Sequence, residues 1–241
     1  MADAMELKRD TAGETLVGSL MKFMMSSVGS KVVMAITGLG LGVFIVGHLA
    51  GNLLAFAGRD AFNSYATALQ ATKPLVWGAR IALLIGFPLH ILTAIRSVQL
   101  NRAARPVAYA HDPKSPASAA SKTMMISVAL FLAFFLYHLA HFTLHLTGPQ
   151  PTGLLASGGY DAFTMLVMGF QQPLIALLYV VAMVLLSAHI SHGIYSLFQH
   201  LGLWGAKWTP FLKNASLVVG YGLCAGFASI PLAVLLGFIK P

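Results

Sequence analysis

The sequence is poor in charged residues, and poorest in acidic ones. Only 9% of its 241 residues are charged, and 7 acidic residues stand against 15 basic ones. A soluble domain carries about 25% charged residues, so water cannot be the main solvent of this chain. Cysteine is scarcer still. Cys224 is the single one, so a disulfide within the chain is excluded.

The net charge of +8 does not indicate a nucleic-acid partner. Binding to nucleic acid needs basic residues gathered on one water-facing surface, whereas these residues lie mainly in the segments between apolar runs. We therefore expect the basic residues to report membrane topology, and we expect no nucleic acid among the partners.

Five apolar runs are each long enough for a helix that crosses a membrane, which takes about 20 residues. They cover residues 32–57, 77–101, 123–147, 173–199 and 214–239. We predict an all-α fold, an integral membrane bundle of five transmembrane helices. Residues 31–241 would form this domain, and residues 1–30 a cytoplasmic N-terminal segment.

The N-terminal segment has two parts. Residues 1–15 are polar and mixed in charge, which is not typical of a cleaved signal peptide. Residues 16–25 are modestly apolar around Lys22. This second part suits an interfacial helix, a segment that docks on a partner, or an ordered tail, and the sequence does not choose between them.

Basic residues are distributed unevenly between the two ends of the predicted bundle. Arg59, Lys73, Arg80 and Lys240 fall on one side. Eleven fall on the side of the N-terminus: Lys8, Arg9, Lys22, Lys31, Arg96, Arg102, Arg105, Lys114, Lys122, Lys207 and Lys213. Because cytoplasmic segments are enriched in Lys and Arg, we expect the N-terminus in the cytoplasm.

Four of the nine histidines lie inside predicted helices, one in each of the first four. They are His48, His90, His138 and His189. A polar side chain deep in a membrane helix is costly and usually faces a partner in the bundle interior. Counted from the helix ends, His48 and His138 share an outer level, and His90 and His189 share an inner level about 6 to 10 Å away at about 1.5 Å per residue. This placement predicts two stacked sites, and matched depths disfavour four unrelated interhelical hydrogen bonds.

Two facing imidazoles without a nearby thiolate or carboxylate are typical of haem iron, because the porphyrin supplies the other ligands. Zinc would need more ligands from the protein. No Cys-x-x-Cys-His sequence is present, so we predict that the bundle encloses two haem b groups held without covalent attachment. Glycines around His48 would let a macrocycle approach the first helix, although tight helix packing explains them equally well.

Short sequence motifs lie at or near these histidines. They are GHLAGN at residues 47–52, AFNSY at 61–65, FPLH ending at His90, YHLAHF around His138 and HISHGIYS from His189. Together they resemble the diheme cytochrome b membrane anchor of succinate dehydrogenases and fumarate reductases (succinate:quinone oxidoreductases, respiratory complex II). The resemblance runs from residue 26 to residue 238. In that family the histidines of helices I and III hold the outer haem, and those of helices II and IV hold the inner haem.

The resemblance implies an electron-transfer subunit that does not itself bind succinate. It would anchor a flavoprotein subunit and an iron–sulfur subunit on the cytoplasmic face of a bacterial cytoplasmic membrane. It would pass electrons between the iron–sulfur subunit and a membrane quinone, with menaquinone as the family-level expectation. Succinate oxidation and fumarate reduction use the same subunits and cofactors, so the sequence does not choose the direction of the reaction. A higher oligomer of the complex also stays open.

Some polar residues are further candidates for the site. His141, one turn beyond His138, is the alternative ligand at the outer level. The candidates for contact with a quinone or a haem propionate are Ser27, Ser30, Lys31, Asn52, His141, His145 and His192. All seven acidic residues lie outside the predicted helices, so the carboxylate proton path that some relatives use is not expected.

Other functions fit parts of the same pattern. A diheme cytochrome b of a hydrogenase or a formate dehydrogenase would also carry haem. The quinol-oxidising bc complexes are disfavoured, because they need two histidines on each of two helices at a spacing that these helices lack. A transporter or proton channel could use membrane histidines as a relay without haem.

Overall fold

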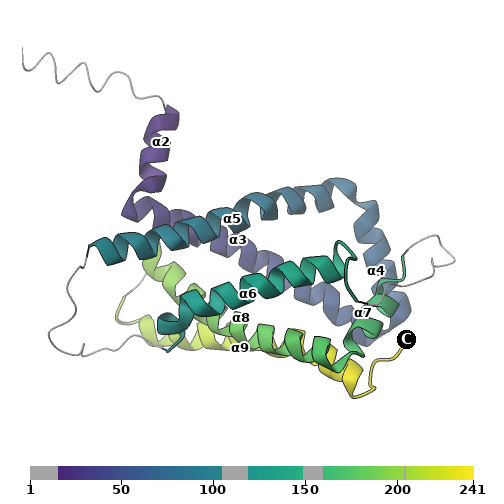
Figure 1. Cartoon of the computed structure of the whole chain (residues 1–241). Coiled ribbons are helices and arrows are strands. Elements are labelled where there is room, and N and C mark those ends of the chain that lie inside the picture. Colours follow the sequence, from purple (N-terminus) through teal and green to yellow (C-terminus); the bar gives the residue numbers. More distant parts are fainter. Residues whose placement is uncertain (1–15, 105–118, 149–159, 204) are drawn as a thin grey trace, which may run out of the picture.

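The computed structural model describes residues 16–104, 119–148, 160–203 and 205–241. Within these ranges the chain is helical and contains no strand (Figure 1). In chain order the elements are α2 (Leu16–Met25), α3 (Ser27–Leu53), the 3-10 helix η1 (Leu54–Ala57), α4 (Arg59–Ala71), α5 (Lys73–Ala103), α6 (Ala119–Phe142), α7 (Ala162–Phe170), α8 (Pro173–His200) and α9 (Thr209–Leu235).

Five of these helices are long and apolar enough to cross a membrane, namely α3 with η1, α5, α6, α8 and α9. The prediction of an all-α, multi-pass membrane bundle is confirmed. The span α5 has 31 residues and therefore measures about 46 Å at about 1.5 Å per residue. The hydrocarbon layer is about 30 Å thick, so the ends of α5 extend into the headgroup regions.

The starts of the spanning helices follow from their local sequence. Ser26 caps α3, because its Oγ accepts a hydrogen bond from the Gly29 N–H (3.0 Å). In α5, α8 and α9 a proline occupies the first turn. A proline is favourable there because the first turn of a helix needs no backbone N–H.

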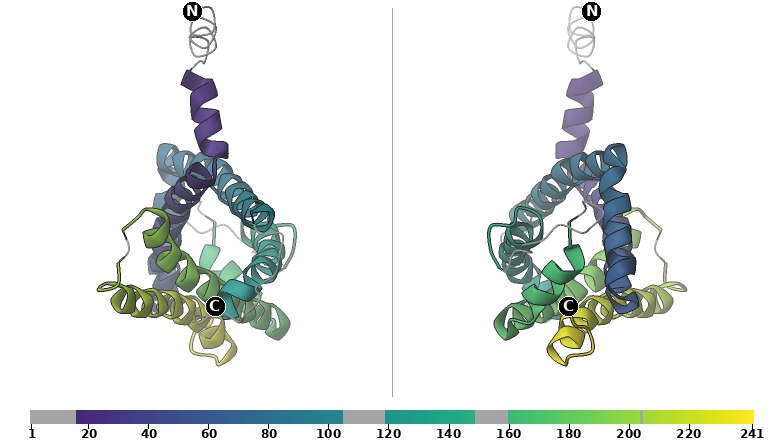
Figure 2. Two further views of the ribbon diagram at one scale, coloured as in Figure 1. Left: turned by 90° about the vertical axis from the view of Figure 1, so that its left-hand side faces the viewer. Right: turned by 90° about the vertical axis from the view of Figure 1, so that its right-hand side faces the viewer.

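The spans run up and down along one axis and surround a central region (Figure 2). α8 packs most extensively against α9 and also contacts α6 and α3, while α3 packs against α5 and α9. The apolar core lies toward the end of the bundle that α7 covers, where Phe163, Phe170 and Tyr179 are buried. At the opposite end, α2 runs crosswise to the spans (Figure 1).

The observed helices differ from the predicted ones at several boundaries. The third span was expected to reach residue 147, but α6 ends at Phe142. The chain turns there because His145 adopts a positive φ of 54° and the Leu146 N–H donates to the Ala140 carbonyl (2.8 Å). The second span begins earlier than expected, at Lys73, and the fifth covers Thr209–Leu235. The short helices α4 and α7, which lie outside the spans, were not predicted.

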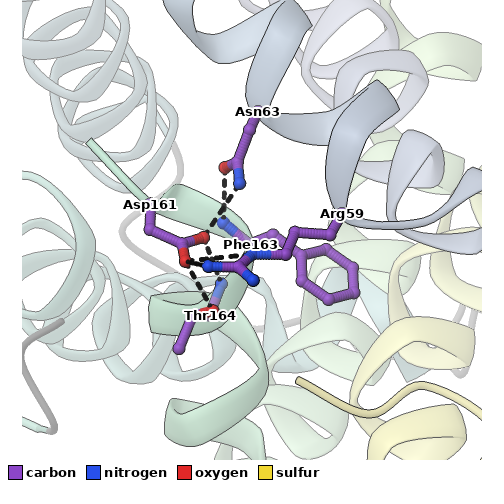
Figure 3. A network of polar contacts seen from close by, with 5 residues as sticks. All are labelled: Arg59, Asn63, Asp161, Phe163 and Thr164. Carbon is purple, nitrogen blue, oxygen red and sulfur yellow. Dashed lines mark hydrogen bonds and ion pairs between the residues drawn. The ribbon is translucent and has the colours of Figure 1, made fainter. Parts of the chain in front are cut away.

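A polar network joins α4 to α7 (Figure 3). Asp161 caps α7, because it accepts hydrogen bonds from the Thr164 N–H (3.0 Å) and the Thr164 hydroxyl (2.8 Å). Its carboxylate also accepts from Arg59 Nε (3.1 Å) and from Asn63 Nδ2 (2.9 Å). Asn63 Oδ1 in turn accepts from the Phe163 N–H (3.0 Å). The network therefore fixes how the two short helices close this end of the bundle.

The network also sets the charge state of Asp161. Burial by itself would raise the pKa of this carboxyl, but the hydrogen bonds from Asn63, Thr164 and Arg59 outweigh that effect and hold the pKa at about 2. The ordinary value is 3.8, so the ionised carboxylate stabilises the folded state above that pH. This stabilisation is lost as the pH falls from about 4 toward 2.

We predict that Asp161→Asn lowers the melting temperature of the protein in detergent. The amide cannot accept all of these hydrogen bonds, and Arg59 loses its ion pair. The lowered pKa corresponds to about 2 kcal/mol of stability at neutral pH. A dye that reacts with the Cys224 thiol as the bundle opens reports the melting.

Asp60→Asn is the matched control, because Asp60 is an exposed carboxylate on the first turn of α4. It should melt like the wild type. Equal melting temperatures for the two variants would contradict the stabilising role of Asp161. So would a melting temperature that still falls below about pH 4 in Asp161→Asn as steeply as in the wild type.

Candidate functional site

Four membrane-spanning helices bring four histidines together in two facing pairs. His48 on α3 faces His138 on α6, with ring centroids 5.9 Å apart and ring planes at 79°. His90 on α5 faces His189 on α8, with centroids 6.2 Å apart and planes at 78°. These are the two pairs that the depths of the residues predicted.

The two pairs lie at different levels of the bundle. His48 and His138 lie near the ends of α3 and α6 that point toward α4 and α7. His90 and His189 lie farther toward the end of the bundle that carries α2. We refer to them below as the outer pair (His48 and His138) and the inner pair (His90 and His189).

The separation within each pair fits one metal ion between the two rings. A metal–imidazole bond is about 2 Å long, so two rings on opposite sides of one ion have centres about 6 Å apart. Both observed separations, 5.9 and 6.2 Å, agree with this. In the described part of the chain, His, Cys, Asp and Glu form no group of three or more that could hold a metal. An ion at either pair would therefore have to bring its remaining ligands, as haem iron does.

The helices that each pair connects are not packed closely against one another. Over the described residues, neither α3 with α6 nor α5 with α8 is among the extensively packed helix pairs, although each of these helices packs well against another neighbour. All four histidines remain partly accessible in spite of their place within the bundle. The facing rings thus bridge helices that leave room between them, which fits a flat group inserted at each level.

Hydrogen bonds orient the inner pair. His90 Nδ1 lies 3.1 Å from the Met34 carbonyl oxygen and 3.2 Å from Thr37 Oγ1. A carbonyl oxygen can only accept, so Nδ1 carries the proton, and Nε2 is the nitrogen left for a metal. His189 Nδ1 contacts Met124 Sδ (3.1 Å), and this again leaves Nε2. A Cβ on Gly38 would lie 3.0 Å from His90 Cε1, so the small residue at that position makes room for the ring.

Tyr179 of α8 orients His138 of the outer pair. Its hydroxyl lies 3.3 Å from His138 Nδ1 and 3.1 Å from His141 Nδ1. We assign His138 Nδ1–H as the donor to this hydroxyl, and the hydroxyl as the donor to His141, because one O–H can accept from one ring and donate to the other. His138 Nε2 is then free to bind a metal.

His48 is held by its own helix and by aromatic rings. The Asn52 side-chain amide donates to the His48 carbonyl oxygen (2.7 Å) and lies 3.3 Å from the ring Nδ1. Phe44 stacks on the His48 ring (centroids 5.5 Å apart, planes at 10°), and Phe227 of α9 lies at 5.8 Å. Asn52, a quinone candidate from the sequence, therefore supports His48.

The geometry separates His141 from its neighbour His138. His141 is fully buried and stacks on Phe142 (4.0 Å). A Cβ on Gly148 or Gly169 would lie 2.5 or 3.0 Å from His141 Nε2. This ring is thus enclosed by the chain beyond α6 and by α7, and His138 is the residue that faces His48.

The remaining candidates from the sequence lie apart from the two pairs. His145 is exposed and stacks on Tyr160 (5.2 Å, planes at 8°). His192 contacts Ser196 one turn along its own helix (3.1 Å). At the inner end, Ser30 is buried with its hydroxyl donating to the Met24 carbonyl (3.0 Å), whereas Ser27 is exposed and Lys31 partly exposed.

The sequence did not single out Tyr179, Met34 or Thr37 as supporting residues. Tyr179 was the easiest to find, because a hydroxyl within an apolar span needs a partner. The Met34 carbonyl carries no sequence signal, since every residue has one and only the packing of α3 against α5 selects it.

Comparison of the chain with protein-family models, with curated proteins and with solved structures found no match in any of the three. The functional assignment therefore rests on the geometry of the histidine pairs and on the motifs around them.

We predict that Tyr179→Phe destabilises the bundle by about 1 to 3 kcal/mol, because it leaves the ring nitrogens of His138 and His141 without their shared partner. Thermal unfolding in detergent measures the change. Tyr221→Phe is the control, because Tyr221 is 60% exposed on α9, and it should melt like the wild type. Identical melting of the two variants would show that the Tyr179 hydroxyl supports neither histidine.

Proposed function

We propose that this chain is a diheme cytochrome b, the membrane-anchor subunit of a succinate:quinone oxidoreductase. The observation that carries the proposal is the geometry of the two histidine pairs. Each pair has the separation of two imidazoles on one metal ion and bridges helices that are not packed on each other. The motifs around the same histidines support this class over a haem-free relay.

In this proposal the outer pair, His48 and His138, holds one haem b, and the inner pair, His90 and His189, holds the other. A haem with two imidazole ligands exchanges one electron and has no free position for oxygen, so it supplies electron transfer alone. The chain's own residues fix the ring orientations. Met34 orients His90 through its carbonyl, and a hydrogen bond of this kind makes the imidazole a stronger donor to a metal.

The proposed orientation rests on the charges at the two ends, and the proposed partners rest on the family resemblance. The end with α2 carries most of the basic residues, and the enrichment of Lys and Arg on the cytoplasmic side supports a cytoplasmic position for it in a bacterial cell. The resemblance then adds a flavoprotein subunit and an iron–sulfur subunit at this end. A membrane quinone, menaquinone by family expectation, would exchange electrons with one of the haems. Ser27 and Lys31 are the accessible inner candidates for its contact.

Haem content per chain tests the proposal directly. The wild type, purified from membranes of a haem-sufficient host, should contain two low-spin b haems. Alanine at His48, His90, His138 or His189 should remove one haem or prevent assembly, because the remaining imidazole cannot hold the iron from both sides. Pyridine haemochrome spectra and reduced-minus-oxidised spectra give the number.

His145→Ala is the matched control, because His145 is exposed and lies outside the spans; it should keep both haems. Full haem content in any of the four pair variants would remove that residue from the assignment. A wild-type protein without haem would favour the histidine relay. The subunits that copurify distinguish a succinate:quinone oxidoreductase from a hydrogenase or formate dehydrogenase.

A further inference from the structure

The helices α2 and α3 meet at a sharp corner in the chain. Figures 1 and 2 agree that α2 runs across the direction of the spans instead of continuing α3. The first turn of α3 begins at Ser27, only two residues after the last residue of α2, Met25. The candidate membrane span that contains α3 begins at Ser27, so α2 lies directly at one end of a span.

Four side-chain hydrogen bonds fix the corner. Ser26 Oγ donates to the Phe23 carbonyl (2.7 Å) and accepts from the Gly29 N–H (3.0 Å). Ser30 Oγ donates to the Met24 carbonyl (3.0 Å), and Arg96 Nε of α5 donates to the Met25 carbonyl (2.7 Å). The carbonyls of Phe23, Met24 and Met25, which have no partner within a helix, thereby accept from Ser26, from Ser30 of α3 and from Arg96 of α5.

Gly29 is the residue that the corner requires. A Cβ at this position would lie 1.8 Å from the Phe23 carbonyl oxygen and 2.6 Å from its carbon. Backbone atoms at such distances cannot be avoided by a side-chain rotation. Any other residue would therefore change the direction of α2.

The surface of α2 is mainly apolar and, away from its contact with α3 at the corner, stays exposed. None of its residues is buried, and Leu16, Val17 and Leu20 are 86, 69 and 55% exposed. At 3.6 residues per turn, Gly18, Ser19 and Lys22 share one side of the helix. The apolar residues occupy the rest, and this is the pattern of a helix that lies in a membrane interface.

The end of the bundle at α2 is strongly basic. Its described residues include Lys22, Lys31, Arg96, Arg102, Lys207 and Lys213. Asp60 and Asp161, the acidic residues within the described ranges, lie on α4 and beside α7 at the opposite end. A surface of this charge complements anionic lipid headgroups.

We propose that α2 lies flat in the headgroup layer of an anionic membrane leaflet. Its apolar side chains enter the acyl boundary, and the basic residues at the same end of the bundle bind lipid phosphates. The corner at Ser26 and Gly29 sets this orientation independently of any cofactor. Of the alternatives left by the sequence, the interfacial helix is the one that the direction of α2 and the surrounding charge support.

Spin labels test the proposal in the intact protein. In a Cys224→Ser background, single cysteines at Val17, Leu20, Ser19 and Lys22 carry the label, and the protein is reconstituted in nanodiscs of phosphatidylcholine with phosphatidylglycerol. Labels at Val17 and Leu20 should be accessible to oxygen and shielded severalfold from an aqueous nickel chelate. Labels at Ser19 and Lys22 should show the reverse. In nanodiscs of phosphatidylcholine alone, the shielding should fall severalfold.

Each other outcome contradicts a stated part of the proposal. Equal nickel accessibility at all four positions would place α2 in water. Exclusion of both reagents would mean that protein covers the helix, as in docking on a partner subunit. Unchanged shielding in the neutral nanodiscs would overturn the role of anionic lipid.

Gly29→Ala tests the corner, and Gly40→Ala on the same helix is its control, because a Cβ at Gly40 meets nothing within 4 Å. Both variants are first shown to be monodisperse and helical. The accessibility pattern should be lost in Gly29→Ala and kept in Gly40→Ala. A pattern that survives in Gly29→Ala would show that the corner does not orient α2.

Discussion

An imidazole ring within the hydrocarbon layer of a membrane must find partners for its nitrogens in the protein, because hydrocarbon offers none. In this chain that constraint acts on four helices at once, since α3, α5, α6 and α8 each carry one such histidine facing another across the bundle. Each of these helices packs directly against another neighbour, α3 on α5 and α6 on α8, so the facing histidines connect helices that direct packing does not bring together.

At each level one ring of the pair lies against a different kind of group. At the inner level His90 Nδ1 lies against the Met34 carbonyl, and at the outer level His138 Nδ1 lies against the Tyr179 hydroxyl. A carbonyl can only accept, whereas a hydroxyl can pass a hydrogen bond onward to a second ring, here His141. The two proposed haem sites would therefore sit in different electrostatic surroundings, although their ligands are the same.

Both ends of the bundle are closed by hydrogen bonds to helix termini. At one end Asp161 caps α7 and binds Arg59 of α4. At the other end, Ser26 and Arg96 hydrogen-bond the backbone groups where α2 meets α3. A membrane span needs few specific contacts to be helical, because hydrocarbon offers its backbone no other hydrogen-bond partner. At the interface, water can bind the backbone groups instead. Their direction therefore depends on such side chains.

The five spans and the depths of the histidines could be predicted from the sequence, because the length and hydropathy of a span are local properties and the rise of an α-helix is constant. The depths also predicted that His48 pairs with His138, with His141 as the alternative. The structure distinguishes these two histidines of α6, since one turn along a helix changes the direction of a side chain as well as its height. The network around Asp161 joins residues about a hundred positions apart in the chain, and the direction of α2 depends on a contact between α5 and Met25. Sequence by itself determined which segments enter the membrane and at what level their polar residues lie, whereas only the tertiary structure decided which polar groups meet, because that depends on how the helices are rotated and packed.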